Sequence, residues 1–249
     1  MKAIIIAAGK GKRLRPYTDD RPKCLVEIAG RSILAHQLEA YRQAGVDEIY
    51  IVRGYRKDLV TFPNVQTFDN DDFENNNILL SLFYAESAMA GGFLFSYADI
   101  VFRADAVKCA IQTPGDFALV IDRRWQETYV GRSDHPVDEA EVARVRNGVV
   151  EVVGKKTVVA EDAAGEFIGL GRVSATGAEQ MRKRFHARKA ELAGKPYGRA
   201  PRFEVAYLTD LFNDLISSGE KMQAAFIDGG WREIDTVQDL ERARGVLGQ

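Results

Sequence analysis

The start of the chain carries the residues whose chemistry is easiest to recognise. An apolar run over residues 3–7 opens directly into a short loop that combines two glycines with several cations. Such a loop exposes backbone N–H groups after a strand, and the cations beside it attract the charge of a polyphosphate. Glycine also allows the backbone to approach a ligand closely. The pattern predicts a phosphate site formed by Ala7, Ala8, Gly9, Lys10, Gly11, Lys12 and Arg13.

The loop differs from two common phosphate-binding motifs. A dinucleotide-binding fingerprint needs Gly-x-Gly-x-x-Gly, but Leu14 stands where the third glycine would be. A Walker loop needs Gly-Lys-Ser/Thr at a fixed spacing, and the sequence has no such segment. An ordinary exposed basic turn is the alternative. The position of the loop directly after the first strand, with Lys23 close behind it, favours phosphate binding.

Carboxylates that could hold a cation lie at two other places. Asp99 follows the apolar run 93–98, and Glu233 and Asp235 flank Ile234. Mg²⁺ prefers oxygen ligands, usually one or two carboxylates together with phosphate oxygens. Alternate residues of an extended segment share a face, so positions 233 and 235 can point the same way. We expect Mg²⁺ at these three carboxylates. The alternative for Asp235 is that it caps the helix that follows it.

Composition excludes several classes of protein. The 34 basic and 36 acidic residues give a net charge of −2, which provides no overall field for nucleic acid or an anionic membrane. Two cysteines cannot build a disulfide framework, and no apolar run approaches membrane-spanning length. The first residues lead straight into a core strand, so we expect a cytoplasmic protein without a signal peptide. The three histidines show no spacing typical of metal ligands, and nothing suggests a covalent nucleophile.

The elements that must position these residues alternate along the chain, which predicts an α/β fold with a Rossmann-like, mainly parallel sheet flanked by helices. We expect a single domain over 1–249, with a small inserted β lobe at about 123–165 that contains the hairpin turn Asn147-Gly148. Ligands of such sheets lie beyond the carboxyl ends of the strands. The expected strands are 2–7, 48–53, 64–68, 93–98, 116–122, 167–173 and 222–228, and the expected helices are about 32–44, 76–89, 103–112, 176–193, 204–218 and 236–247.

Two further groups of side chains could contact ligands. Amides in the run Asn75-Asn76-Asn77 can read the edge of a base, although one asparagine could equally cap the next helix. Aromatic faces and carboxylates attract a cationic or amine group, although a single aromatic residue is more often part of a core. The candidates for the alcohol or amine portion of an acceptor are Asp122, Trp125, Tyr129, Tyr207 and Trp231.

The glycine loop followed by Pro22-Lys23 resembles the signature of the nucleotidyltransferase family that includes sugar-phosphate nucleotidyltransferases and phosphocholine cytidylyltransferases. The segments 97–100 and 231–236 look like the metal-binding segments of its cytidylyltransferase branch, which includes the phosphocholine and aminoethylphosphonate enzymes. Many sugar-phosphate relatives instead have Gly-Asp or Asp-Gly-Asp where this chain has Ala98-Asp99. The resemblance implies that the loop wraps the triphosphate of a nucleotide and that Lys23 contacts phosphate. It further implies Asn77 and Ser81 beside the base, and Lys155 and Glu166 on the acceptor side.

The expected function is transfer of CMP from CTP to a small phosphorylated or phosphonate acceptor, with release of pyrophosphate. Catalysis would consist mainly of positioning and charge stabilisation, by Mg²⁺ and by Arg13, Lys23 and Lys155. The alternatives are a sugar-1-phosphate nucleotidyltransferase that uses UTP or dTTP, and a non-catalytic nucleotide-sensing module. We expect neither nucleic acid nor a membrane as a partner, and a homodimer is compatible with the sequence.

Overall fold

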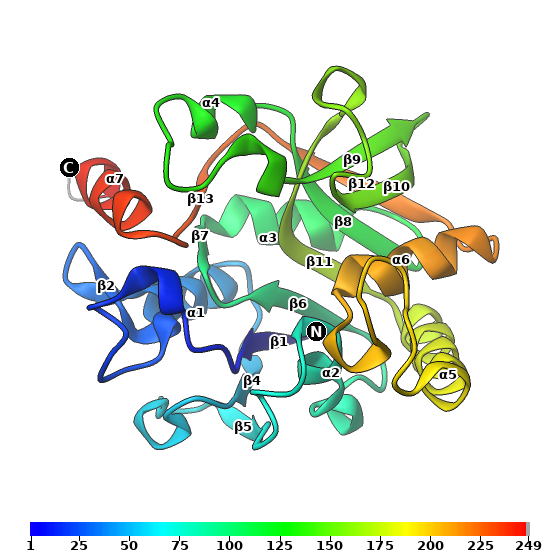
Figure 1. Cartoon of the computed structure of the whole chain (residues 1–249), viewed down its shortest axis with the longest axis horizontal. Helices are drawn as coiled ribbons and strands as arrows, with labels where there is room; N and C mark the ends of the chain where they lie inside the picture. The colour runs from blue at the N-terminus through cyan, green and yellow to red at the C-terminus, as the bar shows by residue number, and fades with distance from the viewer. Residues whose placement is uncertain (248–249) are drawn as a thin grey trace.

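One sheet of nine strands organises the chain in the computed structural model, which describes residues 1–247 (Figure 1). The strand order is β5-β4-β1-β6-β11-β8-β12-β10-β9. The strands are β1 (Lys2–Ala7), β4 (Glu48–Arg53), β5 (Gln66–Asp69), β6 (Phe93–Tyr97), β8 (Phe117–Asp122), β9 (Glu141–Arg146), β10 (Val149–Lys155), β11 (Gly165–Val173) and β12 (Met222–Ile227). The predicted strands are therefore present, with bounds that shift by one or two residues.

The sheet is mixed rather than mainly parallel throughout. Strands β5, β4, β1 and β6 are parallel neighbours, and β8 is parallel to β12. Strand β11 runs antiparallel between β6 and β8. An apolar run does not record strand direction, so the sequence pattern could not show this reversal.

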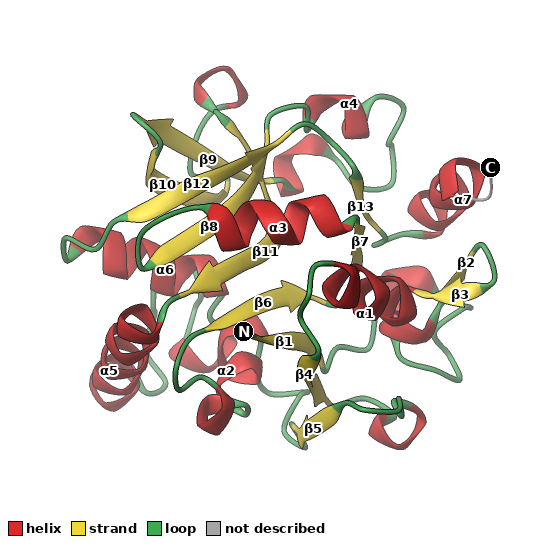
Figure 2. Ribbon diagram, turned by 180° about the vertical axis from the view of Figure 1, so that it is seen from behind, coloured by secondary structure: helices red, strands yellow, loops and turns green. Residues whose placement is uncertain are grey.

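Helices cover both faces of the sheet, which confirms the predicted α/β class (Figures 1 and 2). Ile4 and Ile6 of β1 belong to the core on one face, whereas Ala3 and Ile5 belong to the core on the other, as the alternation of a strand requires. The first core contains side chains of α2 (Ile78–Phe83), α5 (Ala175–Leu192) and α6 (Leu208–Ser217). The second contains side chains of α1 (Ile33–Gln43) and α3 (Ala104–Gln112).

The helix ends follow local signals where these are strong. Ser32 accepts a hydrogen bond from Ala35 N at 3.1 Å, so it is the N-cap that the sequence predicts for α1. The helix expected at 76–89 is shorter, because the chain leaves α-helical geometry at Ala85 and continues through a 3₁₀ turn. The helix expected from 204 begins at Leu208, since Tyr207 is extended and its N–H bonds to the Asp210 carboxylate at 2.8 Å.

The segment expected as an inserted lobe forms the β9–β10 hairpin and the short helix α4 (Gln126–Tyr129). Asn147 and Gly148 both have positive φ, 51° and 78°, as the Asn-Gly turn predicts. The hairpin is not separate from the main sheet, because β10 pairs with β12 and β9 pairs with the start of β11. The edge strand β9 therefore also pairs with β11, a central strand of the same sheet.

Two small pairings lie outside the main sheet, and one of them joins distant parts of the sequence. Strand β7 (Ile100–Phe102) pairs antiparallel with β13 (Trp231–Glu233), and β2 (Glu27–Ile28) pairs with β3 (Arg31–Ser32). The last helix, α7 (Val237–Leu247), packs Leu240 and Ala243 into a cluster with Leu14 and Ile28. The loop after β1 and the segment before α7 are thereby fixed beside one another. No helix within residues 1–247 is both long enough and apolar enough to cross a membrane.

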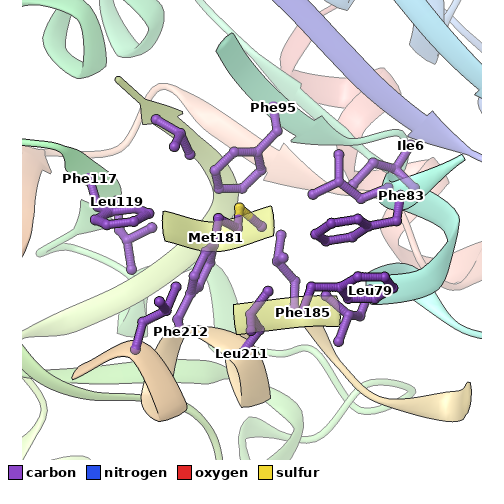
Figure 3. Packing of buried hydrophobic residues seen from close by; sticks show 14 of the residues in the cluster. Ile6, Leu79, Phe83, Phe95, Phe117, Leu119, Met181, Phe185, Leu211 and Phe212 are labelled. Carbon is purple, nitrogen blue, oxygen red and sulfur yellow. The ribbon is translucent and has the colours of Figure 1, made fainter. Parts of the chain in front are cut away.

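Aromatic side chains of several helices and strands fill the larger core, among them Phe95 of β6 and Phe212 of α6 (Figure 3). The ring of Phe212, from α6, lies 5.7 Å from that of Phe95 and 6.1 Å from that of Phe167. These contacts attach α6 to β6 and β11, the strands whose ends reach the cavity described below. The packing at Phe212 therefore supports the position of both strands.

We expect Phe212→Ala to lower the free energy of unfolding by about 3–5 kcal/mol, because it removes a fully buried ring and leaves a cavity. Urea denaturation followed by circular dichroism would measure the change. Val130→Ala is the control, since Val130 is 75% exposed and its truncation should change stability by less than about 0.5 kcal/mol. Equal midpoints for the two variants would contradict the packing described for Phe212.

Candidate active site

A cavity of about 420 Å³ opens where β1 and β6 end. Ala7 and Tyr97, the last residues of these two parallel strands, both line it, as expected for ligand sites of α/β sheets. Its volume lies within the range of small-molecule sites. The predicted site residues that line the cavity are Ala7, Ala8, Gly9, Gly11, Lys12, Arg13, Lys23, Asn77, Ser81, Asp99, Lys155, Glu166, Tyr207, Trp231, Glu233 and Asp235.

The glycines of the first loop have different roles. Gly11 has φ of 64°, and a Cβ there would stand 2.6 Å from Lys23 Cβ, so only glycine allows this close contact. A Cβ at Gly9 would meet no atom within 4 Å, which leaves the backbone there open to a ligand. Lys10 is the exception among the predicted loop residues. It does not line the cavity and pairs with Glu74 outside it.

Lys23 lies at the centre of the charged groups. Its buried Nζ donates to Asp99 Oδ2 at 2.9 Å and to Asp235 Oδ1 at 2.7 Å, while Arg13 pairs with the other oxygen of Asp235. Burial alone would lower the pKa of Lys23, but Asp99 and Asp235 outweigh burial and raise it. Burial would raise the pKa of Asp235, yet Lys23, His135 and Arg13 together hold it well below its usual range. The ammonium of Lys23 and the carboxylate of Asp235 therefore stabilise each other's ionised form.

Asp235 does not cap the last helix. Asp239 Oδ2 instead accepts from Asp235 N at 3.1 Å and from Thr236 N at 2.9 Å, which satisfies the start of α7. Ile234 is fully buried between the two carboxylate positions, and its N–H bonds to Asp99 O at 2.8 Å. This arrangement leaves both oxygens of Asp235 to cations.

One observation in particular indicates that Asp99 and Asp235 could hold a divalent cation. Asp99 Oδ1 is buried and has no hydrogen-bond partner in the described residues, although buried polar atoms normally have one. Asp99 and Asp235 also contact the same Lys23 nitrogen, so their oxygens face one small volume. Paired carboxylate oxygens are the ligands that Mg²⁺ prefers in proteins.

Two buried residues beside this cluster were not found from the sequence. Arg132 donates to Glu233 Oε2 at 2.8 Å and makes two bonds to Asp239, at 2.6 and 2.9 Å. His135 Nδ1 lies 3.0 Å from Asp235 Oδ2, and its Nε2 lies 3.6 Å from Glu233 Oε2. Both residues come from the loop before β9, far from residues 233–239 in the sequence. Spacing therefore gave no signal that could have found them.

The far end of the cavity is rich in carboxyl groups. Lys155, the last residue of β10, bonds to Glu139 at 3.0 Å, and Tyr97 OH donates to Glu141 at 3.3 Å. Burial, opposed by Lys155 and Tyr97 but reinforced by Glu233 and Asp99, raises the pKa of Glu141 to about 7.

Glu166 lies at the same end of the cavity. Its Oε1 accepts from Tyr129 OH at 2.7 Å, while its buried Oε2 has no partner in the described chain. Burial, together with the charge of Glu233, raises the pKa of Glu166 well above its usual value.

The predicted base-side residues line the cavity, but their polar atoms already have partners. Asn77 Oδ1 accepts from Ile78 N at 2.8 Å, so Asn77 caps α2, which is the alternative that the sequence left open. Ser81 accepts from Asn70 at 2.9 Å and donates to Asn76 at 3.2 Å. Asn76 also lines the cavity and exchanges two bonds with Asn70. Asn70, Asn76 and Ser81 therefore form one hydrogen-bonded network beside the cavity.

Three predicted acceptor residues lie outside the cavity. Asp122 is fully buried and accepts from Arg124 N, Gly229 N and the indole N–H of Trp231, so it positions Trp231 rather than facing a ligand. Trp125 packs in a small apolar cluster with Ala140 and Val142. Tyr129 packs against Trp125 and reaches the cavity wall only through its bond to Glu166.

The chain can now be compared with known proteins. Residues 3–158 match the MobA-like NTP transferase domain. A CTP:phosphoglutamine cytidylyltransferase of Campylobacter jejuni is 31% identical over 97% of this chain and 98% of its own length. A UTP–glucose-1-phosphate uridylyltransferase of Haloferax volcanii is 28% identical over 99% of this chain and 96% of its own.

The fold resembles that of a solved structure. The structure of a CTP:phosphocholine cytidylyltransferase from Streptococcus pneumoniae aligns with a TM-score of 0.72 and 22% identity, covering 99% of this chain and 98% of that one. This likeness confirms the α/β fold, and the sequence matches confirm the resemblance of the glycine loop and Pro22-Lys23 to a nucleotidyltransferase signature. The chain therefore belongs to the nucleotidyltransferase family that is defined by the MobA-like NTP transferase domain.

Proposed function

We propose that the protein transfers CMP from CTP to a small phosphorylated or phosphonate acceptor and releases pyrophosphate. The observation that carries the proposal is the hydrogen-bonded cluster of Lys23, Asp99 and Asp235, which lines the same cavity as the glycine loop. CTP is favoured because a CTP:phosphoglutamine cytidylyltransferase aligns with nearly the whole chain.

In the proposed reaction, an anionic oxygen of the acceptor attacks the α-phosphorus in line with the departing pyrophosphate. Arg13 and Lys12 bind the triphosphate beside the open backbone of Gly9. Lys23 donates to the phosphate at which charge develops, and Lys155 orients the acceptor phosphate. No general base is needed, because the attacking phosphate is already an anion. Mg²⁺ held by Asp99 and Asp235, with Glu233 beside them, would offset charge on the reacting phosphates.

The acceptor end suits an ammonium group. Glu141 and Glu166 are buried and line the cavity, and Glu166 Oε2 has no partner within residues 1–247. A primary ammonium group could donate a hydrogen bond to that oxygen, and any ammonium group, quaternary ones included, would favour the ionised forms of both carboxyls. We therefore propose that Glu141 and Glu166, rather than Asp122 and Trp125, recognise the amine.

We expect Asp99→Asn and Asp235→Asn each to lower kcat by about 100-fold or more at saturating Mg²⁺, because each removes an anionic ligand at the reacting phosphate. Pyrophosphate release with CTP measures the rate, and circular dichroism checks that the variants fold. Asp105→Asn, at an exposed position on α3, is the matched control and should keep its rate. Near-normal turnover in both site variants would rule out the assignment of these carboxylates.

Arg13 and Lys23 should affect different steps. Arg13→Ala should raise KM for CTP with little change in kcat, because the half-exposed Arg13 contributes mainly to binding of the triphosphate. Lys23→Ala should lower kcat, because its contact strengthens in the transition state. Arg15→Ala is the control in the same loop, since Arg15 pairs with Asp19 and does not line the cavity. An unchanged KM for CTP in Arg13→Ala would mean that the loop is not the triphosphate site.

The acceptor class can be tested by comparing phosphocholine with 3,3-dimethylbutyl phosphate. In this isostere a carbon atom replaces the quaternary nitrogen, so the head group has no charge while the phosphate is kept. Glu141 is largely neutral below pH 7 and ionised above it. The preference in kcat/KM for the ammonium compound should therefore rise roughly tenfold from pH 6 to pH 8, following the ionised fraction of a group with pKa near 7. The isostere corrects for titration of the acceptor phosphate itself. Glu141→Gln should remove this rise.

Alternative acceptors belong in the same assay. Aminoethylphosphonate and phosphoglutamine should also outperform glucose 1-phosphate with CTP, because both carry an amine. A higher kcat/KM for glucose 1-phosphate, or for UTP or dTTP in place of CTP, would support a sugar-1-phosphate nucleotidyltransferase instead. If no combination of nucleotide and acceptor released pyrophosphate, the result would support a non-catalytic nucleotide-sensing module.

A further inference from the structure

Three side chains meet near Asp235 Oδ2, the oxygen of Asp235 that does not bond to Lys23. His135, Glu233 and Asp235 each offer one ligand atom, and these atoms all lie within 4.8 Å of one another. We propose that they form a second cation position, next to the Asp99–Asp235 pair, in which the imidazole of His135 is a direct ligand. The cation would be a first-row divalent transition metal, because this group of metals includes ions that accept imidazole as well as carboxylate ligands. Mn²⁺ is the paramagnetic probe used in the test below.

The state of His135 is the first reason. Its side chain is 1% exposed, and neither ring nitrogen has a hydrogen-bond partner within the described chain. Buried imidazole nitrogens are normally bonded, so the two nitrogens of His135 remain available to a ligand. Nδ1 lies 3.0 Å from Asp235 Oδ2 without the alignment of a hydrogen bond. Two ligand atoms that each stand about 2.1 Å from one cation are separated by about 3 Å when they are adjacent.

The two oxygens of Asp235 face different partners, which allows two cation positions. Oδ1 is held by Lys23, whose Nζ also contacts Asp99. Oδ2 faces His135 and Arg13. The Arg13 side chain is 53% exposed, so it can turn toward a bound triphosphate and free this oxygen. A shared carboxylate between two cations is a common arrangement in enzymes that act on phosphates.

The proposed ligands are already held in place. Arg132 bonds to Glu233 Oε2 and to both oxygens of Asp239, and Asp239 bonds in turn to the backbone N–H of Asp235. Such outer contacts orient the ligands of metal sites and support their affinity. Arg132 is thus a positioning residue that keeps Glu233 beside His135. It leaves Glu233 Oε1 for a cation.

The test measures binding of Mn²⁺ alone, and of Mn²⁺ with CTP, by electron spin-echo spectroscopy and calorimetry. The wild-type protein should show ¹⁴N modulation from a directly bound imidazole, and selective ¹⁵N labelling of its three histidines should alter that modulation. His135→Gln should lose the imidazole signal and bind Mn²⁺ about 10–100-fold more weakly. His135→Phe serves as a second variant without a nitrogen. His186→Gln, at an exposed histidine, should keep both the signal and the affinity.

Absence of ¹⁴N modulation in the wild-type protein, with and without CTP, would overturn the proposal. Its persistence in both His135 variants would do the same. The ¹⁵N measurement requires no substitution, so a spectrum that the label leaves unchanged would overturn the proposal even if a His135 variant fails to fold. If the label does alter the spectrum, loss of the signal in either His135 variant, with its retention in His186→Gln, assigns it to His135. Because these measurements follow cation binding and need no acceptor, their failure would leave the proposed transfer of CMP standing.

Discussion

The buried ammonium of Lys23 is the constraint on which the site depends. A buried cation is stable only when it is paired, and Lys23 is paired with Asp99 and Asp235. Its Cβ also packs against Gly11, where no side chain would fit. One residue thereby fixes the distance between the loop after β1, the turn after β6 and the segment before α7. Removal of either carboxylate would leave the buried ammonium with one anionic partner instead of two.

The parts of this arrangement that the sequence predicted have local signals. The glycine loop follows an apolar strand, Glu233 and Asp235 alternate around a buried isoleucine, and Asn147-Gly148 forms the expected hairpin turn. Each of these features depends on neighbouring residues and on backbone geometry. They could therefore be read before the fold was known.

The remaining features depend on contacts between segments that are distant in the sequence. The antiparallel direction of β11 and the pairing of the hairpin with β11 and β12 leave no trace in an apolar pattern. His135 and Arg132 acquire their partners only when the loop before β9 meets residues 233–239. Asp122 illustrates the opposite error. A carboxylate at the end of a strand was expected at a ligand, but three internal donors satisfy it.

The hairpin has a consequence for how such a protein can change over evolutionary time. Glu141 is the first residue of β9 and Lys155 is the last residue of β10, so the two are paired at the open end of the hairpin. Glu139 lies just before β9. The Lys23 cluster draws all its side chains from other parts of the chain. Substitutions within the hairpin can thus alter the charge of one end of the cavity while the contacts of Lys23 persist. Evolution can therefore change the hairpin end of the cavity while the Lys23 cluster is conserved. Protein design can likewise exchange the hairpin and keep the rest of the site.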